Sequence, residues 1–225
     1  MRAAAIVVAA GKGCRFGSGT PKQFRELRGR SIVARACGAL RACPEVGEIV
    51  LVLPEENVTR PPADLTGLAD AIVAGGRTRQ ESVARGLERV GPEIDAVLVH
   101  DGARPFPGRA LVARVAAAAM AGPVVPALPV TDSLKAVEGD RVLGTVEREG
   151  CMRVQTPQGF PADVLRSLHA GATVSDVRDD AELCEGTGIE VRVVNGDPWN
   201  LKITTPGDLD LAAWLLDTGR VREVP

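Results

Sequence analysis

The sequence predicts an α/β fold in which helices flank a mostly parallel sheet. Two observations predict it: short apolar segments alternate with amphipathic ones along the chain, and the first apolar segment leads directly into a glycine-rich turn. The chain has 225 residues, of which 45% are hydrophobic, so we expect one domain with a sizeable core. No internal repeat or low-complexity linker divides it, and we assign residues 1–225 to a single domain.

Each element follows from its apolar pattern and from the residues at its ends. The first strand is a continuous apolar run of the length expected for a strand buried on both faces. Helices open at Ser31 and Thr78, whose hydroxyls suit N-caps. The predicted strands are Ala4–Ala10, Glu48–Leu53, Ala71–Ala74, Ala96–His100, Gly122–Ala127 and Glu190–Val194. The predicted helices are Ser31–Ala42, Thr78–Val90, Arg109–Ala121, Pro161–Ala172, Asp180–Thr187 and Gly207–Leu216.

Residues 131–150 depart from this alternation. The segment is polar and has a turn signal, Glu138–Gly139–Asp140, between two runs that resemble strands. It therefore predicts a β-hairpin with little apolar face of its own. Because an isolated hairpin is only marginally stable in water, we expect it to pack on something, with a second subunit as the natural candidate. A mobile surface excursion is the alternative.

Composition excludes several classes of function. The net charge of −2 gives no basic field for nucleic acid, and 3% aromatic residues without any tyrosine give no base-stacking platform. Five cysteines, an odd number without CxxC spacing, are typical of reduced thiols in a cytoplasmic protein and predict no zinc site. The longest apolar stretch, Val115–Val130, contains three prolines, so we expect no membrane helix.

The turn after the first strand is suited to an oligophosphate. Gly11 and Gly13 allow backbone N–H groups to approach a ligand, while Arg15 and Lys22 add positive charge. Two commoner phosphate loops do not fit. A dinucleotide fingerprint would need glycine or alanine where Phe16 stands, and neither nearby lysine precedes a serine or threonine as in a P-loop. Taken alone, the turn could equally be a structural strand-to-helix connection.

Charged and glycine-rich segments follow two further predicted strands. The third strand is followed by Gly75–Arg77 and the fourth by Asp101–Pro105. Ligands of parallel sheets lie beyond the carboxyl ends of the strands, so we expect these segments to converge with the first turn. Asp101 suits a magnesium ion and Arg104 suits a phosphate. The alternatives are a capping aspartate and a surface salt bridge.

The two histidines do not indicate nucleophilic catalysis. We expect His100 to pack at a strand end and His169 to be solvated, and no Ser–His–Asp or Cys–His spacing is present. One reaction class needs no histidine base, because a phosphomonoester with a second pKa of about 6 is mostly ionised at neutral pH. Its attack on the α-phosphorus of a nucleoside triphosphate needs positioning and charge neutralisation, which Arg, Lys and Mg²⁺ supply.

Four motifs occur together in a fixed order. They are AAGKGCRF with PKQF (Ala9–Phe24), HDGARPF (His100–Phe106), TPQGF (Thr156–Phe160) and NLKITTPGDL (Asn200–Leu209). With these motifs the chain resembles the 2-C-methyl-D-erythritol 4-phosphate cytidylyltransferase family, from about residue 3 to residue 216. The resemblance implies a Rossmann-like nucleotidyltransferase fold with a protruding β-hairpin dimerisation arm at about residues 131–150.

The resemblance also implies a reaction. In this family CMP is transferred from CTP to 2-C-methyl-D-erythritol 4-phosphate, with Mg²⁺ as cofactor. The products are 4-diphosphocytidyl-2-C-methyl-D-erythritol and pyrophosphate, and the step belongs to the non-mevalonate route of isoprenoid biosynthesis.

Roles for particular residues follow from matching positions. Arg15 and Lys22 would stabilise the pentavalent α-phosphate and the leaving pyrophosphate, whereas Arg148 and Lys202 would position the acceptor phosphate. Arg148 lies on the hairpin, which in this family crosses to the partner subunit of a homodimer. The implied CTP-binding residues are Ala9, Ala10, Gly11 and Gly13 at the first turn, with Gly76 and Ser82 at the cytosine. The implied acceptor-binding residues are Asp101, Arg104, Ser133 and Thr156, with Asp101 also binding the metal.

Two alternatives to this function follow from the sequence. A ribitol-5-phosphate cytidylyltransferase would share the fold and the CTP chemistry, but AAG at Ala9–Gly11 and the HDGARPF motif favour methylerythritol phosphate. A nucleotide-sensing domain without catalysis would be expected to lose Arg15, Lys22 or Lys202, and all three are present. Cys14 lies between two cationic residues, which favours its thiolate, and its reactivity is left open.

Overall fold

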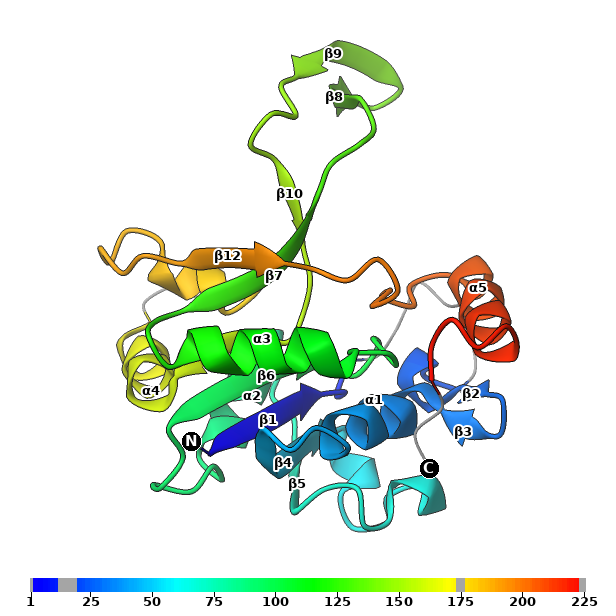
Figure 1. Cartoon of the computed structure of the whole chain (residues 1–225), viewed down its shortest axis with the longest axis vertical. Helices are drawn as coiled ribbons and strands as arrows, with labels where there is room; N and C mark the ends of the chain where they lie inside the picture. Colours follow the sequence, from blue (N-terminus) through cyan, green and yellow to red (C-terminus); the bar gives the residue numbers. More distant parts are fainter. Residues whose placement is uncertain (1, 12–19, 173–176, 223–225) are drawn as a thin grey trace.

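The computed structural model describes residues 2–11, 20–172 and 177–222, which form an eight-stranded sheet with helices on both faces and a projecting two-stranded arm (Figure 1). The strand order is β10-β7-β11-β6-β1-β4-β5, and β12 pairs with β7. The strands of this sheet are β1 (Ala3–Val8), β4 (Val46–Leu53), β5 (Ala71–Ala74), β6 (Ala96–Asp101), β7 (Val124–Pro129), β10 (Met152–Val154), β11 (Gln158–Pro161) and β12 (Arg192–Asn195).

Five helices and several short elements surround the sheet within the described residues. The helices are α1 (Ile32–Arg41), α2 (Arg79–Leu87), α3 (Arg109–Ala119), α4 (Ala162–Gly171) and α5 (Pro206–Asp217). The 3₁₀ turns are η2 (Lys22–Phe24), η3 (Glu55–Asn57), η4 (Ala63–Leu65) and η5 (Ala181–Cys184), and a small two-stranded ribbon is formed by β2 (Glu26–Leu27) and β3 (Arg30–Ser31).

The central strand β1 organises the parallel part of the sheet. It pairs in parallel with β4 and β6, and β4 pairs in parallel with β5. On the other side, β11 runs antiparallel to β6 and β7, while β12 is parallel to β7. The predicted mostly parallel sheet is confirmed. It brings the carboxyl ends of β1, β4, β5 and β6 to one edge, where such folds bind ligands.

Two buried layers pack the sheet against its helices. Side chains alternate along β1, so that Ala5 and Val7 pack with α1 and α3, whereas Ala4 and Ile6 pack with α2 and α4; all four are 0% exposed. In Figure 1, α1 and α3 lie in front of the sheet. The continuous apolar run predicted for this strand is therefore buried on both faces.

Most predicted elements are confirmed, including the N-caps at Ser31 and Thr78, whose hydroxyls accept from the backbone N–H three residues further on. One predicted helix is wrong. Residues 180–187 contain only the short turn η5, and Gly186 and Gly188 have φ of +73° and +79°, conformations that end a helix. The sequence also does not predict β10 and β11, since three or four residues show too little alternation.

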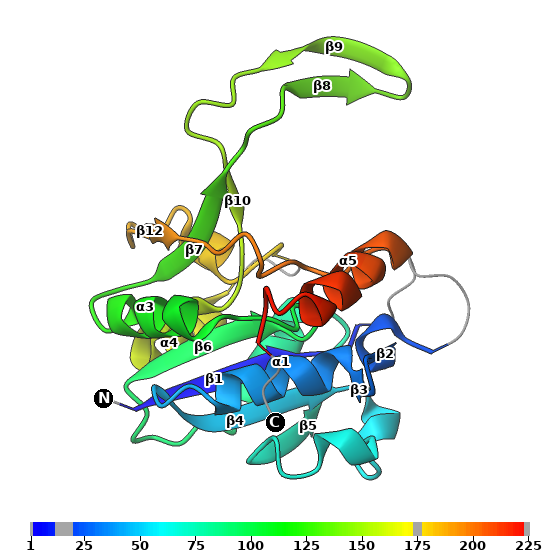
Figure 2. The same cartoon turned by 45° about the vertical axis from the view of Figure 1, so that its right-hand side comes forward.

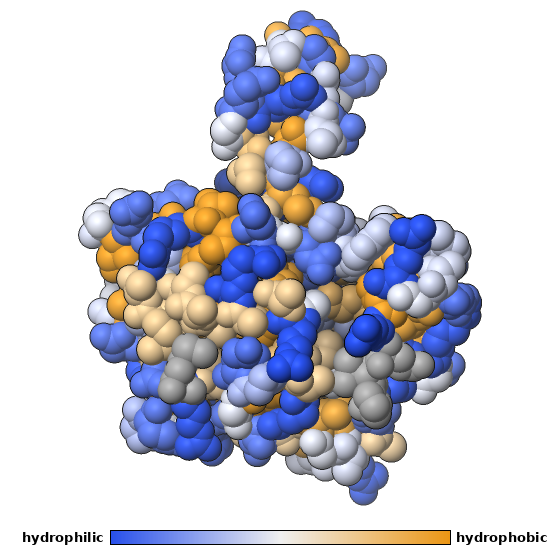
Figure 3. Space-filling model, in the orientation of Figure 1, coloured by the Kyte–Doolittle hydropathy of each residue, from blue (hydrophilic) through white to orange (hydrophobic). Residues whose placement is uncertain are grey.

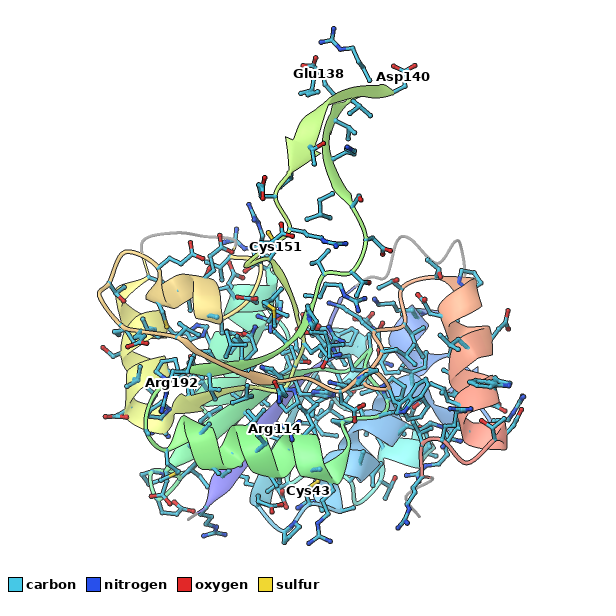
Figure 4. The ribbon with its side chains drawn as sticks, turned by 45° about the horizontal axis from the view of Figure 1, so that its top comes forward. Cys43, Arg114, Glu138, Asp140, Cys151 and Arg192 are labelled. Carbon is cyan, nitrogen blue, oxygen red and sulfur yellow. The ribbon has the colours of Figure 1, made fainter. Side chains whose placement is uncertain are left out.

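The predicted hairpin at residues 131–150 is confirmed. Strands β8 (Leu134–Glu138) and β9 (Arg141–Val146) pair antiparallel around Gly139, whose φ is +58°. Together they form an arm that stands clear of the body in both cartoons (Figures 1 and 2). Figure 4 labels Glu138 and Asp140 at its tip. Apart from the partly exposed Leu134, every residue from 131 to 150 is exposed, so the arm adds nothing to this chain's own core.

No helix among the described residues is long and apolar enough to cross a membrane. The apolar stretch Val115–Val130 is divided between the end of α3 and strand β7.

Candidate functional site

A cleft of about 770 Å³ lies at the carboxyl ends of β1, β5 and β6. The predicted convergence of the strand ends is thereby confirmed, because both described glycine turns and the segment after β6 contribute to one cavity. The residues that line it are Val8, Ala9, Ala10, Gly11, Lys22, Gln23, Glu55, Gly75, Gly76, Arg77, Thr78, Arg79, Ser82, Arg85, Asp101, Ala103 and Lys202.

The described start of the first turn is held by a buried amide. Gln23, 3% exposed, donates from Nε2 to the carbonyl oxygens of Ala9 at 2.8 Å and Gly11 at 2.9 Å. The glutamine of the PKQF motif therefore fixes the backbone of the AAG motif from a position 12 to 14 residues away. The predicted site residues Gly13 and Arg15 lie outside the described residues, as does Cys14.

The second glycine turn leaves no room for side chains. A Cβ at Gly75 would lie 2.2 Å from the Cβ of Ala10, and one at Gly76 would lie 2.2 Å from the Cβ of Glu81. Ser82 holds this turn, since its Oγ accepts from the Gly76 N–H at 3.0 Å and donates to the carbonyl of Thr78 at 2.8 Å. Gly76 and Ser82 thus lie on a closely packed wall of the cleft, and their nucleotide contacts stay a prediction.

Asp101 and Lys202 form an ion pair inside the cleft. Lys202 Nζ lies 2.7 Å from Asp101 Oδ2, and Arg79 Nε lies 3.6 Å from Asp101 Oδ1. Burial alone would raise the pKa of the Asp101 carboxyl, but the charges of Lys202 and Arg79 outweigh it, so this pKa lies well below its usual range. Lys22 donates from Nζ to the carbonyl of Ile203 at 3.2 Å, next to Lys202.

A buried network behind Arg79 was not evident in the sequence. Arg79 Nη1 donates to Asp180 Oδ2 at 2.6 Å, and the Nε2 atom of His169 lies 3.1 Å from Asp180 Oδ1. The main-chain N–H of Asp180 donates to the side-chain oxygen of Gln158 at 3.2 Å. The expectation that His169 is solvated is wrong: its side chain is 5% exposed, because η5 folds over α4.

Asp180 is the anchor of this network. Its carboxyl is fully buried, which raises its pKa, yet the hydrogen bond from His169 and the charge of Arg79 lower that pKa below the ordinary value. The contact with Asp180 therefore holds the Arg79 side chain in position at the cleft. No spacing in the chain could have revealed this contact, since Arg79 and Asp180 are 101 residues apart.

His100, Thr156 and Arg104 form a second support, behind the wall of the cleft. His100 Nε2 lies 3.0 Å from the carbonyl oxygen of Arg104, and its Nδ1 lies 3.2 Å from Thr156 Oγ1, which also accepts from the Asp101 N–H at 3.0 Å. Burial lowers the pKa of His100 to about 4, so the ring is neutral. The expectation that His100 packs at a strand end is confirmed.

The side chains of Arg104 and Thr156 contact the protein itself. Arg104 is 9% exposed and donates from Nη1 to the carbonyl of Asn200 at 2.8 Å, which joins the HDGARPF and NLKIT motifs. Thr156 is 5% exposed. Neither is among the residues that line the cleft, so their predicted contact with the acceptor stays a prediction.

Two other predicted site residues lie on or beside the arm. Arg148 donates from Nη1 to the carbonyl of Thr131, and Ser133 is exposed two residues further along. Neither lines the cleft of its own chain. The arm stands clear of the body, and the predicted contacts of these residues with the acceptor stay predictions (Figure 2).

The charges of the cleft favour a polyanion. Among the described residues that line it, five are cationic, namely Lys22, Arg77, Arg79, Arg85 and Lys202, whereas two are acidic, Glu55 and Asp101. Glycine turns and cations at the carboxyl edge of a parallel sheet are the features of a nucleotide-binding site. The fold and the cleft together define an α/β nucleotidyltransferase-like domain.

Comparison with known proteins identifies the particular family. The family model described as "IspD: 2-C-methyl-D-erythritol 4-phosphate cytidylyltransferase" matches residues 3–218. A curated relative of that name from Cereibacter sphaeroides is 42% identical over 221 residues, which cover 96% of this chain and 97% of the relative. Another from Frankia casuarinae is 44% identical, covering 96% and 81%. The chain belongs to the 2-C-methyl-D-erythritol 4-phosphate cytidylyltransferase family.

Solved structures give the same result. The structure described as 2-C-methyl-D-erythritol 4-phosphate cytidylyltransferase from Thermus thermophilus is 40% identical, with a TM-score of 0.78 over 96% of this chain and 98% of that one. A 4-diphosphocytidyl-2C-methyl-D-erythritol synthase from Anaerococcus prevotii is 27% identical with a TM-score of 0.80 over 96% of both chains. The resemblance seen in the four motifs is confirmed over nearly the whole chain.

Proposed function

We propose that this chain transfers CMP from CTP to 2-C-methyl-D-erythritol 4-phosphate, giving 4-diphosphocytidyl-2-C-methyl-D-erythritol and pyrophosphate. The observation that carries the proposal is the cationic cleft at the carboxyl edge of the sheet, in which Lys22, Lys202 and Asp101 lie together. The family match favours methylerythritol phosphate over ribitol 5-phosphate as the acceptor. It also disfavours a sensing domain without chemistry.

The reaction needs charge neutralisation and alignment more than proton transfer. The acceptor phosphate is ionised at neutral pH, so it attacks the α-phosphorus of CTP directly, and pyrophosphate leaves in line. Lys22 would neutralise the pentavalent α-phosphate together with Arg15, and Lys202 would hold the attacking phosphate. Neutral, buried His100 takes no part as a base.

CTP would be bound mainly by backbone groups. The turn at Ala9, Ala10, Gly11 and Gly13 would contact the phosphates, and the Gly75–Gly76 turn would face the base. Because added side chains at Gly75 or Gly76 would collide with their neighbours, this wall is closely packed, and only glycine leaves its present space for a base. Such a wall favours a pyrimidine, which is smaller than a purine.

We propose Mg²⁺ as the cofactor. Among the described residues, no group of three or more His, Cys, Asp and Glu side chains is arranged to hold a metal by itself. The ionised carboxylate of Asp101 nevertheless fits Mg²⁺, which usually binds one or two carboxylates and takes its other ligands from substrate phosphates and water. When bound, the ion would neutralise phosphate charge beside Lys22 and Lys202.

We also propose a homodimer in which each arm completes the partner's cleft. Large apolar side chains on the arm are exposed, including Val137 at 61%, Val142 at 58% and Leu143 at 57%. Figure 3 shows further apolar surface at the base of the arm. Burying these side chains against a second copy would give the arm the packing that it lacks, and would carry Arg148 and Ser133 toward the other site.

A mixture of two defective variants tests the crossing of the arm. Subunits carrying Arg148→Ala, mixed with subunits carrying Lys22→Ala, should recover part of the activity, because one site of each hybrid dimer lacks both defects. A mixture of Arg148→Ala with Lys202→Ala should recover equally well. If exchange of subunits is demonstrated and activity does not return, the arm serves its own subunit.

The cellular location is proposed from the thiols. The four cysteines within the described residues are all free, and three of them are buried. Free thiols fit the reducing cytoplasm, where we place this enzyme.

The direct test of the function is pyrophosphate release from CTP and Mg²⁺ with each acceptor in turn. We expect release with methylerythritol phosphate and little with ribitol 5-phosphate, with ATP as the control donor for base selection. Faster release with ribitol 5-phosphate would overturn the proposed acceptor, whereas the proposed mechanism of CMP transfer would still hold. If CTP binds but neither acceptor gives pyrophosphate release, a nucleotide-sensing domain without catalysis becomes the favoured interpretation.

A further inference from the structure

A second cavity, of about 410 Å³, lies beside α1 on the other side of the segments that support the cleft. Its walls come from α1, the loop that follows β6, the segment at residues 197–199 and the C-terminal segment at residues 220–222. The C-terminal segment descends from α5 toward α1 in Figure 2, and Figure 4 labels Cys43, which follows α1 in the chain. Among the described residues, this cavity and the cleft share none of their lining residues.

The buried part of the cavity lining is mostly apolar, and its buried arginine, Arg35, donates to the carbonyls of Leu27 and Arg28. Ala39 and Cys43 come from α1 and its end, and Phe106, 7% exposed, comes from the loop after β6 between two prolines. The Cys43 thiol is 1% exposed and donates to the carbonyl of Ala39 at 3.2 Å. Burial raises the pKa of this thiol to about 11, so Cys43 stays protonated and neutral at physiological pH. This part of the lining therefore suits an apolar group rather than a second charge.

The mouth of the same cavity is cationic. Among the described lining residues, four are arginines and one is acidic, Asp197, so the local charge is strongly positive although the whole chain carries −2. Arg109, Arg220 and Arg222 are exposed there, where guanidinium groups can meet an anion through two hydrogen bonds.

Arg220 is held in position by aromatic rings. Its guanidinium carbon lies 5.5 Å from the ring centre of Trp199 and 5.1 Å from that of Trp214. Such cation–π contacts fix a long side chain and leave its N–H groups free to turn outward to a ligand. Trp199, 38% exposed, also lines the cavity and offers a flat apolar face beside this charge.

We propose that this cavity is a binding site for a small organic anion with an apolar body, of the class of aryl and alkyl phosphates. The anion lies at the arginines of the mouth, and the apolar body occupies the floor formed by Ala39, Cys43 and Phe106. A volume of about 410 Å³ is within the range of small-molecule sites. CTP and its acceptor, which are polar throughout, match the cleft and not this floor.

The ligand would contact the back of the segments that carry the cleft. The cavity-lining loop begins directly after Arg104, and Trp199 stands three residues before Lys202. These two segments are joined, since Arg104 donates to the carbonyl of Asn200 and the Ile203 N–H donates to the carbonyl of Ala103. The site is therefore separate from the cleft but adjacent to its supports.

Fluorescence of Trp199 gives a local readout. The chain has two tryptophans and no tyrosine, so a Trp214→Phe variant reports from Trp199 alone. Phenyl phosphate is the probe, and we expect a saturable change in emission with a Kd of about 1 mM or lower. Inorganic phosphate and benzyl alcohol, which carry the charge or the ring alone, should bind at least about tenfold more weakly. Saturating CTP should not abolish this change in Trp199 emission, because CTP is expected to bind in the cleft.

Matched variants test the two halves of the site. Ala39→Phe fills the floor and should weaken binding by at least about tenfold, whereas Ala117→Phe on the exposed face of α3 should not. Arg109→Gln should weaken binding several-fold, and Arg89→Gln, an exposed arginine outside the cavity, should not. Calorimetry of phenyl phosphate binding repeats each comparison with a readout that does not depend on tryptophan fluorescence. If Ala39→Phe fails to fold, the comparison of Arg109→Gln with Arg89→Gln tests the site.

Three results would overturn the proposal. Displacement of phenyl phosphate by CTP would place the probe in the cleft. An equal response to inorganic phosphate would mean that the arginines bind anions without an apolar site. Unchanged binding in both Ala39→Phe and Arg109→Gln would place the probe elsewhere on the molecule.

Discussion

Replacing His100 by asparagine should remove one large, identifiable part of the dependence of stability on pH. His100 is fully buried at the end of β6, with Nε2 on the carbonyl of Arg104 and Nδ1 on the hydroxyl of Thr156. A carbonyl can only accept, so Nε2 carries the hydrogen, and Nδ1 accepts from Thr156. Protonation would give Nδ1 a hydrogen as well and oppose the Thr156 hydroxyl, which holds the Asp101 N–H.

The magnitude follows from the two pKa values of His100. In the unfolded chain its pKa is 6.5, and burial lowers it to about 4 in the folded protein. Between these values the unfolded state binds the additional proton, so stability is fully present above pH 6.5 and falls as the pH drops toward 4. At about 1.4 kcal/mol for each pH unit, the free energy of unfolding loses about 3 kcal/mol over this range.

Urea denaturation of the wild type and of His100→Asn, repeated across this range of pH, gives the free energy of unfolding of each protein as a function of pH. The expected effect is the difference between the slopes of these two plots. The acidic groups of the chain titrate in both proteins and cancel. Nuclear magnetic resonance checks the cause directly, because the chain has only two histidines and the signal absent from the variant belongs to His100. Equal slopes, or a His100 imidazole that titrates near its ordinary value, would refute the argument.

Three further predictions concern the cleft. Lys22→Ala should lower kcat by about 10²–10³, the scale for one preorganised donor to the transition state, and a change below about threefold would remove Lys22 from the mechanism. Gly75→Ala, whose new methyl would lie 2.2 Å from a side-chain carbon, should cost about 1–3 kcal/mol of stability and raise the KM for CTP; Gly171→Ala, at the end of α4, meets nothing within 4 Å and is the control. Asp180→Asn should destabilise by about 3 kcal/mol, because Arg79 loses a fully buried partner, and urea curves that match the wild type would contradict this.

The parts of the fold that could be predicted are those with a local cause. Strand β1 is apolar at every position because both of its faces are buried, and α2 starts at Thr78 because the threonine hydroxyl caps it. The short strands β10 and β11 have no such cause, since they form only where β7 and β6 offer free edges. The amphipathic pattern of residues 180–187 predicts a helix, whereas the positive φ of Gly186 and Gly188 ends the chain's helical path after a short turn.

The candidate site divides in the same way. Residues that line the cleft, such as Gly76, Asp101 and Lys202, either follow a strand directly or belong to a motif, so they could be found from the chain alone. The residues that hold them in place could not. Asp180 reaches Arg79 across 101 residues, and Gln23 reaches the carbonyl of Ala9 across 14, by contacts that exist only after folding.

Contacts of this kind hold both the carboxylate and the backbone of Asp101 in position at the end of β6. Its carboxylate meets Lys202 and Arg79, its N–H is held by Thr156, and Arg79 is itself held by Asp180. Two buried groups thus fix the position of Asp101: Thr156 acts through the backbone N–H, and Asp180 acts through the cation Arg79. Because the charges of Lys202 and Arg79 favour the ionised form, the carboxylate stays charged well into acid. Loss of activity on acidification to about pH 6 would therefore reflect protonation of the acceptor phosphate, because His100 stays neutral and Asp101 stays ionised at that pH.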